Sequence, residues 1–264
     1  MSSYRFLIVE EEDGVFTVAL NRPETLNSWN EAMRVEMRDL MRQIQGNRHA
    51  RVLIITGTGR AFSAGEDVNE MRERSVGKVT TRDFRALARN IHNFLDDLES
   101  IELPVIAAIN GVCAGGGLEL ALSCDFRIVA QGARLGFPEM RVGLIPGSGG
   151  CSRLVKAIGL LRAKELVMRG RMVDAATADR YGLATELVPD AELMTRAKSF
   201  ARELCEWSPM SLGLAKVILQ NCANTDLETS RTLERLGNSV LSETEEHRES
   251  VNAFLEKRKA RFNT

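Results

Sequence analysis

Two glutamates in this 264-residue sequence are candidates for acid–base chemistry. Glu119 comes two residues after a run of three glycines, and Glu139 directly follows Pro138. Two neighbouring carboxyl groups can hold a water between them, and each well-placed proton transfer accelerates a reaction about 100- to 10,000-fold. Each acid can also simply complement the dipole of a helix in whose first turn it lies. On residue type alone, both interpretations stay open.

Three glycine-rich segments could bring the backbone close to a ligand. They span residues 60–67, 110–119 and 136–150, and the first two directly follow predicted strands. Glycine between a strand and a helix permits a positive φ or a close approach of the backbone, although a tight turn explains any single cluster equally well. None of them contains the fingerprint of a dinucleotide site, a phosphate loop or a nucleophile elbow.

The charge balance argues against a general attraction to nucleic acid or to an anionic membrane. Thirty-five basic and 36 acidic residues leave a net charge of -1. Arg34, Arg38 and Arg42 form a basic stripe on one predicted helix, but acidic residues interleave with it. We therefore interpret the stripe as a solvated helix face, with an RNA-binding surface as the alternative. The three histidines are dispersed and predict neither a metal site nor a catalytic triad.

The cysteines and the chain ends indicate an intracellular protein. Five scattered cysteines without a C-x-x-C pair favour reduced thiols. The first residues lack the pattern of a signal peptide, and the apolar runs are only as long as strands, so no membrane span is expected. The last three residues, 262–264, are not a peroxisomal signal. We expect a cytoplasmic location.

The pattern of apolar residues predicts an α/β fold followed by a helical part. Short apolar runs at 5–10 and 15–20, separated by the turn residues Asp13-Gly14, predict a β-hairpin. Asn30 is expected to cap a helix that reaches about Gln45. The other predicted elements are helices at 83–98 and 115–123 and strands at 52–56, 103–109, 125–130 and 184–188. The alternation predicts parallel strands covered on both faces. We expect a core over residues 1–190 and a helical part over 191–264.

Taken together, these segments resemble the crotonase (enoyl-CoA hydratase/isomerase) family. The resemblance covers nearly the whole chain, and the order and spacing of its motifs make it specific. It is carried by N-R-P and L-N-S near the start, F-S-A-G-E-D, G-V-C-A-G-G-G-L-E-L-A-L-S-C-D, F-P-E-M-R-V-G-L-I-P-G-S-G-G, and A-F-L-E-K-R-K-A in the tail. It implies a crotonase-like spiral of ββα units, with the helical C-terminal part forming trimers.

The resemblance also implies roles for individual residues. Two backbone N–H groups, matched to Ala64 and Gly116, would bind the thioester oxygen of an acyl-CoA and stabilise the enolate that forms there. Glu139 would give a proton to the α-carbon, and Glu119 would act as base toward water, the two titrating as a coupled pair. Further contacts with the acyl-CoA are implied for Ala61, Phe62, Gly65, Asp67, Gly115, Pro138 and Lys257.

Three positions within these motifs have alternative interpretations. Asp67 could equally cap a helix or brace its loop. Lys257 could lie on a solvated helix end, or it could reach the CoA phosphates from a neighbouring subunit. Glu66 stands where we regard a small residue as usual. We expect its side chain in solvent, with the acyl pocket as the alternative.

The expected function is the reversible hydration of a trans-2-enoyl-CoA to a 3-hydroxyacyl-CoA by a homotrimer or homohexamer. No cofactor and no metal are expected, because acyl-CoA is the substrate. An enoyl-CoA isomerase or another CoA-ester lyase or hydrolase of the family is the first alternative, although isomerases generally keep one glutamate. A non-catalytic CoA- or RNA-binding relative is the second, and a serine protease lacks a suitable Ser/His/Asp set. The acyl group stays open, and its pocket is expected at residues 66–82 and the following helix.

Overall fold

A six-stranded sheet forms the centre of the protein, in the order β1-β2-β3-β5-β7-β10. The computed structural model describes residues 4–77 and 80–262. Part of the loosely patterned stretch at 66–82 and the last two residues therefore lie outside the described ones. The strands of this sheet are β1 (Leu7–Glu12), β2 (Val15–Leu20), β3 (Val52–Gly57), β5 (Val105–Ile109), β7 (Phe126–Ala130) and β10 (Glu186–Val188).

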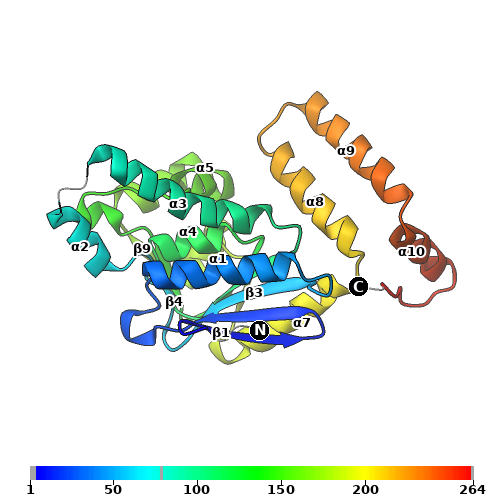
Figure 1. Cartoon of the computed structure of the whole chain (residues 1–264), viewed down its shortest axis with the longest axis horizontal. Helices are drawn as coiled ribbons and strands as arrows, with labels where there is room; N and C mark the ends of the chain where they lie inside the picture. Colours follow the sequence, from blue (N-terminus) through cyan, green and yellow to red (C-terminus); the bar gives the residue numbers. More distant parts are fainter. Residues whose placement is uncertain (1–3, 78–79, 263–264) are drawn as a thin grey trace.

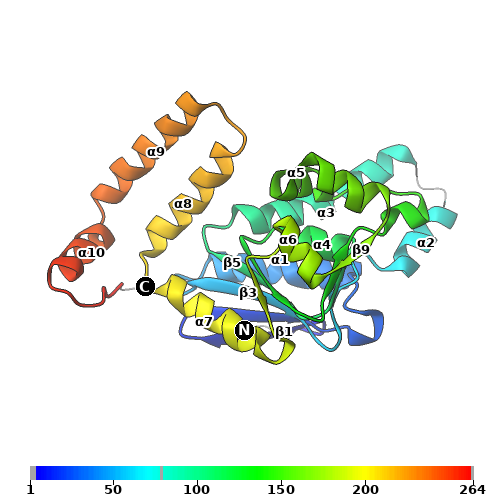
Figure 2. The ribbon, with the colours of Figure 1, turned by 180° about the vertical axis from the view of Figure 1, so that it is seen from behind.

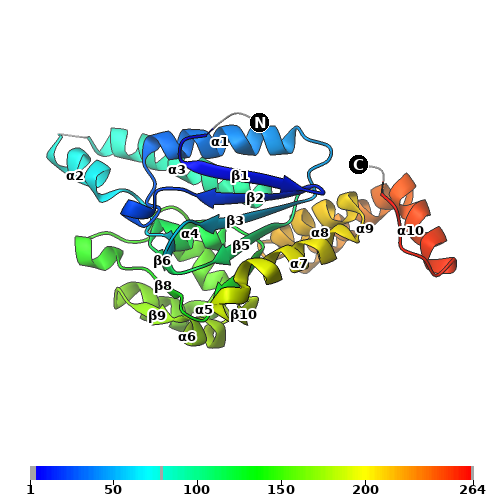
Figure 3. The same cartoon turned by 90° about the horizontal axis from the view of Figure 1, so that it is seen from below.

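The strand directions follow the sequence prediction. Within this sheet only β1 and β2 pair antiparallel, across the predicted Asp13-Gly14 turn, and each further pair is parallel. Figure 3 shows β1, β2, β3 and β5 side by side in this order. β3 and β5 are buried along almost their whole length, because helices cover both faces of a parallel sheet.

Helices cover the two faces of the large sheet. On one face, α7 (Leu193–Cys205) packs Ala197 and Ala201 against Ile54 and Ile106. The other face is covered by the helices α1 (Glu31–Gln45), α3 (Thr81–Ser100) and α4 (Gly116–Leu122). The predicted cap of α1 is confirmed, since the Asn30 side chain accepts a hydrogen bond of 2.9 Å from the amide of Met33.

A second, small sheet was not predicted from the sequence. Its order is β4-β6-β8-β9, and each strand has three residues. Strands β4, β6 and β8 are parallel neighbours; β4 and β6 lie within the first two glycine-rich segments, and β8 ends at Gly136, where the third begins. The sheet therefore brings these segments together. Its strands are β4 (Ala61–Ser63), β6 (Val112–Ala114), β8 (Arg134–Gly136) and β9 (Met172–Asp174).

Short helices and turns complete the core. A helix in the stretch at 66–82, α2, was not predicted, and α5 bends at Gly159, whose φ of 76° is not helical. These elements are α2 (Val68–Val76), α5 (Gly150–Met168), α6 (Ala175–Tyr181) and the 3-10 turns η1 (Pro23–Thr25), η2 (Glu139–Val142) and η3 (Asp190–Glu192). No helix in the described ranges is long and apolar enough to cross a membrane.

Three C-terminal helices project from the core, at the opposite end from α2 (Figures 1 and 2). They are α8 (Pro209–Cys222), α9 (Leu227–Ser242) and α10 (Glu245–Leu255). Lys216 of α8 holds them to the core through Asp125, at 2.8 Å, and through the carbonyl of Leu103, at 2.9 Å. Because α7 packs on the sheet, the projecting part begins with α8 rather than at the predicted boundary after residue 190.

Candidate active site

The loops after β4 and β6 approach each other closely enough to require glycine. Gly65 has a φ of +88°, and a β-carbon placed on it would lie 2.6 Å from the amide nitrogen of Gly116. Gly115 has a φ of +54°, and a β-carbon there would lie 2.8 Å from Oε1 of Glu139. Both positions combine a left-handed backbone with a close contact, so any larger residue would be strained and would displace its neighbour.

Two amides in these loops are free to bind an oxygen. Gly116 and Glu66 donate no hydrogen bond within the described residues, and a β-carbon on Gly116 would lie 3.4 Å from the nitrogen of Glu66. Ala64, by contrast, donates its N–H to the carbonyl of Leu26 at 2.9 Å. The expectation that Ala64 is a donor to the substrate does not fit this geometry, and the free amide lies two residues further on.

Asn27 and Ser63 fix the loop that carries the Glu66 amide. The side chain of Asn27 donates to the carbonyls of Thr58, at 2.9 Å, and Ala61, at 2.8 Å. The hydroxyl of Ser63 donates to the carbonyl of Asn27 at 2.8 Å and accepts from the amide of Gly65 at 3.1 Å. The L-N-S and F-S-A-G motifs thus form one hydrogen-bonded unit.

Asp67 braces the same loop and caps a helix. Its carboxylate accepts from the amide of Asn69 in α2 at 2.9 Å and from Nη1 of Arg22 at 3.0 Å. Burial opposes ionisation, but these hydrogen bonds outweigh it and hold the pKa of Asp67 below its ordinary value. The capping and bracing interpretation of Asp67 accounts for its contacts.

Glu119 is a buried carboxylate with one oxygen anchored and one free. Its side chain lies on α4, and the residue is only 4 % exposed. Oε1 accepts hydrogen bonds from the amides of Ser148, at 2.7 Å, and Gly150, at 3.0 Å, whereas Oε2 has no partner in the described chain. Burial raises the pKa of Glu119, and the two amides, His92 and Arg153 act against that rise.

Glu139 is the less anchored acid of the two. It begins η2, and its Oε2 is buried without a hydrogen-bond partner. Burial raises its pKa to about 7, and the negative charge of Glu119 contributes to the rise. The two carboxyl groups therefore share one site and differ in environment. Such a difference lets one act as a base while the other holds a proton.

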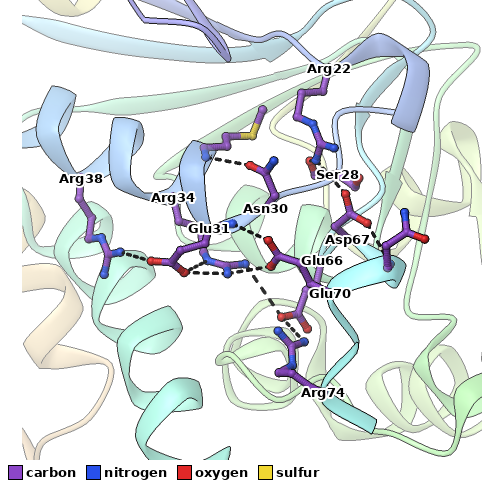
Figure 4. A network of polar contacts seen from close by, with 12 residues as sticks. Arg22, Ser28, Asn30, Glu31, Arg34, Arg38, Glu66, Asp67, Glu70 and Arg74 are labelled. Atoms are coloured by element: carbon purple, nitrogen blue, oxygen red, sulfur yellow. Dashed lines mark hydrogen bonds and ion pairs between the residues drawn. The ribbon is translucent and has the colours of Figure 1, made fainter. Parts of the chain in front are cut away.

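The side chain of Glu66 turns away from its own amide into an ion-pair network (Figure 4). Oε1 of Glu66 lies 2.5 Å from Nη2 of Arg74 and 4.0 Å from Nη1 of Arg34. Nη2 of Arg34 binds Glu31 at 2.8 Å and Glu70 at 3.0 Å. The expectation that the Glu66 side chain lies in solvent is wrong, because it is 22 % exposed and paired.

The basic stripe is only partly a solvated face. Arg34 is 4 % exposed, and Arg38 pairs with Glu31 at 3.0 Å. Two of the three arginines therefore have acidic partners within the chain. This pairing weakens the RNA-binding alternative, which needs cations free for phosphates.

The structure brings most of the sequence-predicted site residues together. Glycines 65, 115 and 116 meet Glu119 and Glu139, and Pro138 precedes η2. Ala61 and Phe62 are buried in β4, at 1 % and 0 % exposure. Lys257 is exposed and follows α10 in the projecting part.

Sequence reasoning missed the groups that surround Glu119. The amides of Ser148 and Gly150 belong to the third glycine-rich segment, so the P-G-S-G-G motif was a usable signal. His92 and Arg153 gave no signal, because their place beside Glu119 depends on how α3 and α5 pack.

Comparisons with known proteins agree with this arrangement. Residues 10–264 match the enoyl-CoA hydratase/isomerase family. The chain is 34 % identical over 261 residues to the crotonyl-CoA hydratase of Syntrophomonas wolfei, covering 98 % of each chain. It is 34 % identical over 257 residues to the 1,2-epoxyphenylacetyl-CoA isomerase of Escherichia coli, covering 97 % of this chain and 98 % of the other.

A solved structure gives the same result for the fold. The enoyl-CoA hydratase of Bacillus anthracis superposes with a TM-score of 0.92 at 35 % identity, covering 98 % of this chain and 99 % of the other. The match extends over the core and the projecting helices alike. The chain therefore belongs to the enoyl-CoA hydratase/isomerase family.

Proposed function

We propose that this protein is an enoyl-CoA hydratase, which adds water reversibly to a trans-2-enoyl-CoA and gives a 3-hydroxyacyl-CoA. The observation that carries the proposal is the arrangement of two free amides, at Gly116 and Glu66, beside the acids Glu119 and Glu139. The hydratase similar to this chain in Syntrophomonas wolfei supports it.

The two free amides would bind the thioester oxygen. Attack of water at the β-carbon pushes negative charge onto that oxygen, and the N–H groups of Gly116 and Glu66 stabilise the enolate. Loss of one such donor typically costs about 3–4 kcal/mol of transition-state stabilisation. Because both donors belong to the backbone, replacing the Glu66 side chain leaves this function in place.

The two acids would divide the proton transfers. Glu119, held by two amides through Oε1, accepts the proton of the attacking water at its free Oε2. Glu139, whose pKa lies near 7, delivers a proton to the α-carbon. The pair holds one proton before and after the reaction, so the reverse reaction uses the same groups with their roles exchanged.

The reaction needs no cofactor. Hydration moves one water across a double bond without a change of redox state, and the acidic and basic groups come from the chain itself. Acyl-CoA is therefore the substrate and the small-molecule partner in this proposal.

An isomerase that uses the same site is the second candidate. A relative in Mycosarcoma maydis that is named an enoyl-CoA isomerase/hydratase favours it. Double-bond migration needs one group to carry a proton between two carbons, and Glu139 alone could do this. The buried, anchored Glu119 favours hydration, because a second carboxylate is needed to activate water.

We also propose a homotrimer or homohexamer in which the helices α8 to α10 contact another copy. Large apolar side chains are exposed on α9 and α10, which a single chain leaves uncovered. These side chains are Leu227, Leu236, Val240, Val251, Phe254 and Leu255. Lys257 follows them and would reach the CoA phosphates bound to a neighbouring copy.

We further propose that the protein acts in the cytoplasm, in the β-oxidation of fatty acids. Enoyl thioesters are intermediates of that pathway, and all five cysteines are free thiols, as a reducing compartment requires.

An assay of the purified protein tests the function. With crotonyl-CoA, we expect the conjugated thioester absorbance to decay as 3-hydroxybutyryl-CoA forms. With a 3-enoyl-CoA, an isomerase would instead produce that absorbance. Turnover of the 3-enoyl ester without hydration of crotonyl-CoA would replace the hydratase by the isomerase.

A further inference from the structure

His92 has a buried nitrogen that the proposed mechanism leaves without a partner. The residue lies on α3, and its Nε2 is buried without a hydrogen bond in the described residues. Buried polar atoms in proteins nearly always have a partner, so an orphaned one calls for a bound group. The residue as a whole is partly exposed, but Nε2 itself is covered, so a bound group has to displace the atoms that cover it.

The face of α3 that carries His92 is turned toward Glu119. His92, Asp96 and Glu99 are spaced by four and three residues, so they share one helix face. Asp96 and Glu99 both bind Nη2 of Arg153, at 2.6 Å, and Nη1 of Arg153 donates to the carbonyl of Ser148 at 3.1 Å. The amide of Ser148 binds Glu119, so this face lies against the acid site.

The charges around this site restrict what His92 can bind. Glu119 is faced by His92 from α3, by Arg153 and Cys151 from α5, and by Glu139 from η2. Arg153 is already paired with two carboxylates. An anionic acyl group would therefore meet the two acids Glu119 and Glu139 beside an arginine that is already paired, which disfavours it. A neutral oxygen avoids this repulsion.

We propose that His92 determines acyl specificity, its Nε2 forming a hydrogen bond with a neutral oxygen that the acyl group carries beyond the double bond. The substrate class is then an enoyl-CoA with a hydroxyl or carbonyl substituent, and the inference rests on the proposed hydratase function. A hydroxyl both donates and accepts, so it satisfies either tautomer of the imidazole, whereas a carbonyl requires the proton on Nε2.

Binding of saturated thioesters tests this without turnover. Hexanoyl-CoA is compared by calorimetry with hydroxyhexanoyl-CoA esters that carry the hydroxyl at successive carbons, and with adipyl-CoA. For the wild-type protein we expect one hydroxyl position to bind about tenfold more tightly than hexanoyl-CoA, and adipyl-CoA to bind less tightly than that ester. In His92→Leu the preference should vanish while hexanoyl-CoA binds as before.

Two controls keep the result interpretable. His247→Leu, at an exposed position on α10, should retain the preference, and thermal melts should show that each variant is folded. His92→Asn should retain part of the preference, because its amide can still form a hydrogen bond. Equal affinities in the wild type, a preference that survives in His92→Leu, or tighter binding of adipyl-CoA would each overturn the proposal.

Turnover of crotonyl-CoA separates specificity from a general effect on the site. This ester has no further oxygen, so His92→Leu should leave its KM unchanged, whereas the acidic limb of kcat/KM should move to higher pH because the charge of His92 lowers the pKa of Glu119. A raised KM for crotonyl-CoA would mean that His92 acts on substrate binding in general, which contradicts the inference. If the hydroxyacyl-CoA binds selectively but crotonyl-CoA is not hydrated, the proposed hydratase function is wrong. If crotonyl-CoA is hydrated but no hydroxyl position is preferred, only the role of His92 is wrong.

Discussion

A carboxylate fixed by two amides and a carboxyl group with one unpartnered, buried oxygen have different tasks, although both are glutamates. Glu119 is oriented by the backbone of the loop before α5, so its free oxygen has a fixed position. Glu139 owes its raised pKa mainly to burial, with a contribution from the charge of Glu119. Its Oε2, which has no hydrogen-bond partner in the described residues, can gain and lose a proton without breaking a hydrogen bond.

Replacing either acid should remove hydration while leaving the fold intact. Glu119→Gln keeps the size of the side chain but cannot accept a proton from water, and Glu139→Gln cannot donate one to carbon. We expect kcat with crotonyl-CoA to fall about 100-fold or more in each variant. Glu192→Gln, at an exposed position in η3, is the matched control. Full turnover in both active-site variants would disprove the mechanism.

The pKa of Glu139 sets the alkaline limit of activity. The reaction requires one proton on the pair, and Glu139 loses it as the pH rises through about 7. We expect kcat/KM to fall above that pH in both the hydration and the dehydration direction, because both use the singly protonated pair. A profile that stays flat well above pH 7 would contradict this assignment.

The raised pKa of Glu139 also makes the stability of the folded protein depend on pH. In the unfolded chain Glu139 ionises near its ordinary value of 4.5, whereas the folded chain retains the proton to about 7. The folded state binds more protons in that window, so its stability falls as the pH rises from 4.5 to 7. Glutamine does not titrate, so Glu139→Gln does not lose stability in this way. The melting temperature of the variant minus that of the wild type should therefore increase as the pH rises from 4.5 to 7.

At the scale of elements, the loop before α5 depends on an ion pair between helices. Arg153 joins α5 to Asp96 and Glu99 of α3, and its Nη1 holds the carbonyl of Ser148. The Arg153 side chain is only 10 % exposed, so its side of these contacts is largely shielded from water. Arg153 is thus a positioning residue for the two amides that anchor Glu119.

Removal of Arg153 should impair catalysis more than substrate binding. In Arg153→Met we expect kcat to fall about 10- to 100-fold with little change in KM, because a small displacement of a catalytic group has effects of this size. Loss of the positive charge also raises the pKa of Glu119, so the acidic limb of the profile should move to higher pH. Arg169→Met, exposed at the end of the same helix, should leave both unchanged. An unmoved pH profile would reduce Arg153 to a purely structural role.

The longer elements could be predicted from the sequence, and the short ones could not. The β1–β2 hairpin and α1 have clear periodicity and turn or cap residues. Strands β4, β6 and β8 have three residues each, too few for an alternating pattern to appear. The sequence also placed the free amide at Ala64 instead of Glu66. The difference depends on the hydrogen bond from the Ala64 amide to the carbonyl of Leu26, which joins two segments that are distant in the sequence.

At the scale of the whole molecule, the projecting helices leave apolar surface uncovered. Phe254 is 83 % exposed and Leu255 is 72 % exposed, next to Lys257. Exposed apolar side chains of this size on neighbouring helices are typical of an interface. The sequence could not predict this surface, since the packing of α8 to α10 decides which side chains stay exposed.

Light scattering should give a mass of three or six chains. Phe254→Asp places a charge in the proposed interface and should yield smaller species, whereas Val76→Asp, on α2 at the other end, should not. If Lys257 serves a neighbouring copy, the smaller species should also show a raised KM for acyl-CoA. A monomeric wild-type protein would overturn the proposed assembly.

The pairing of β4 with β6 has a consequence for how such an enzyme can diversify. Neighbouring strands lie about 4.8 Å apart, so amides in the loops that follow them can each lie about 2.9 Å from one oxygen between them. Backbone pairing sets that spacing, and side chains do not. Position 66 can therefore hold glutamate, with its side chain in a separate ion-pair network. Mutations around the carbonyl can alter the reaction or the acyl preference while enolate stabilisation is inherited unchanged.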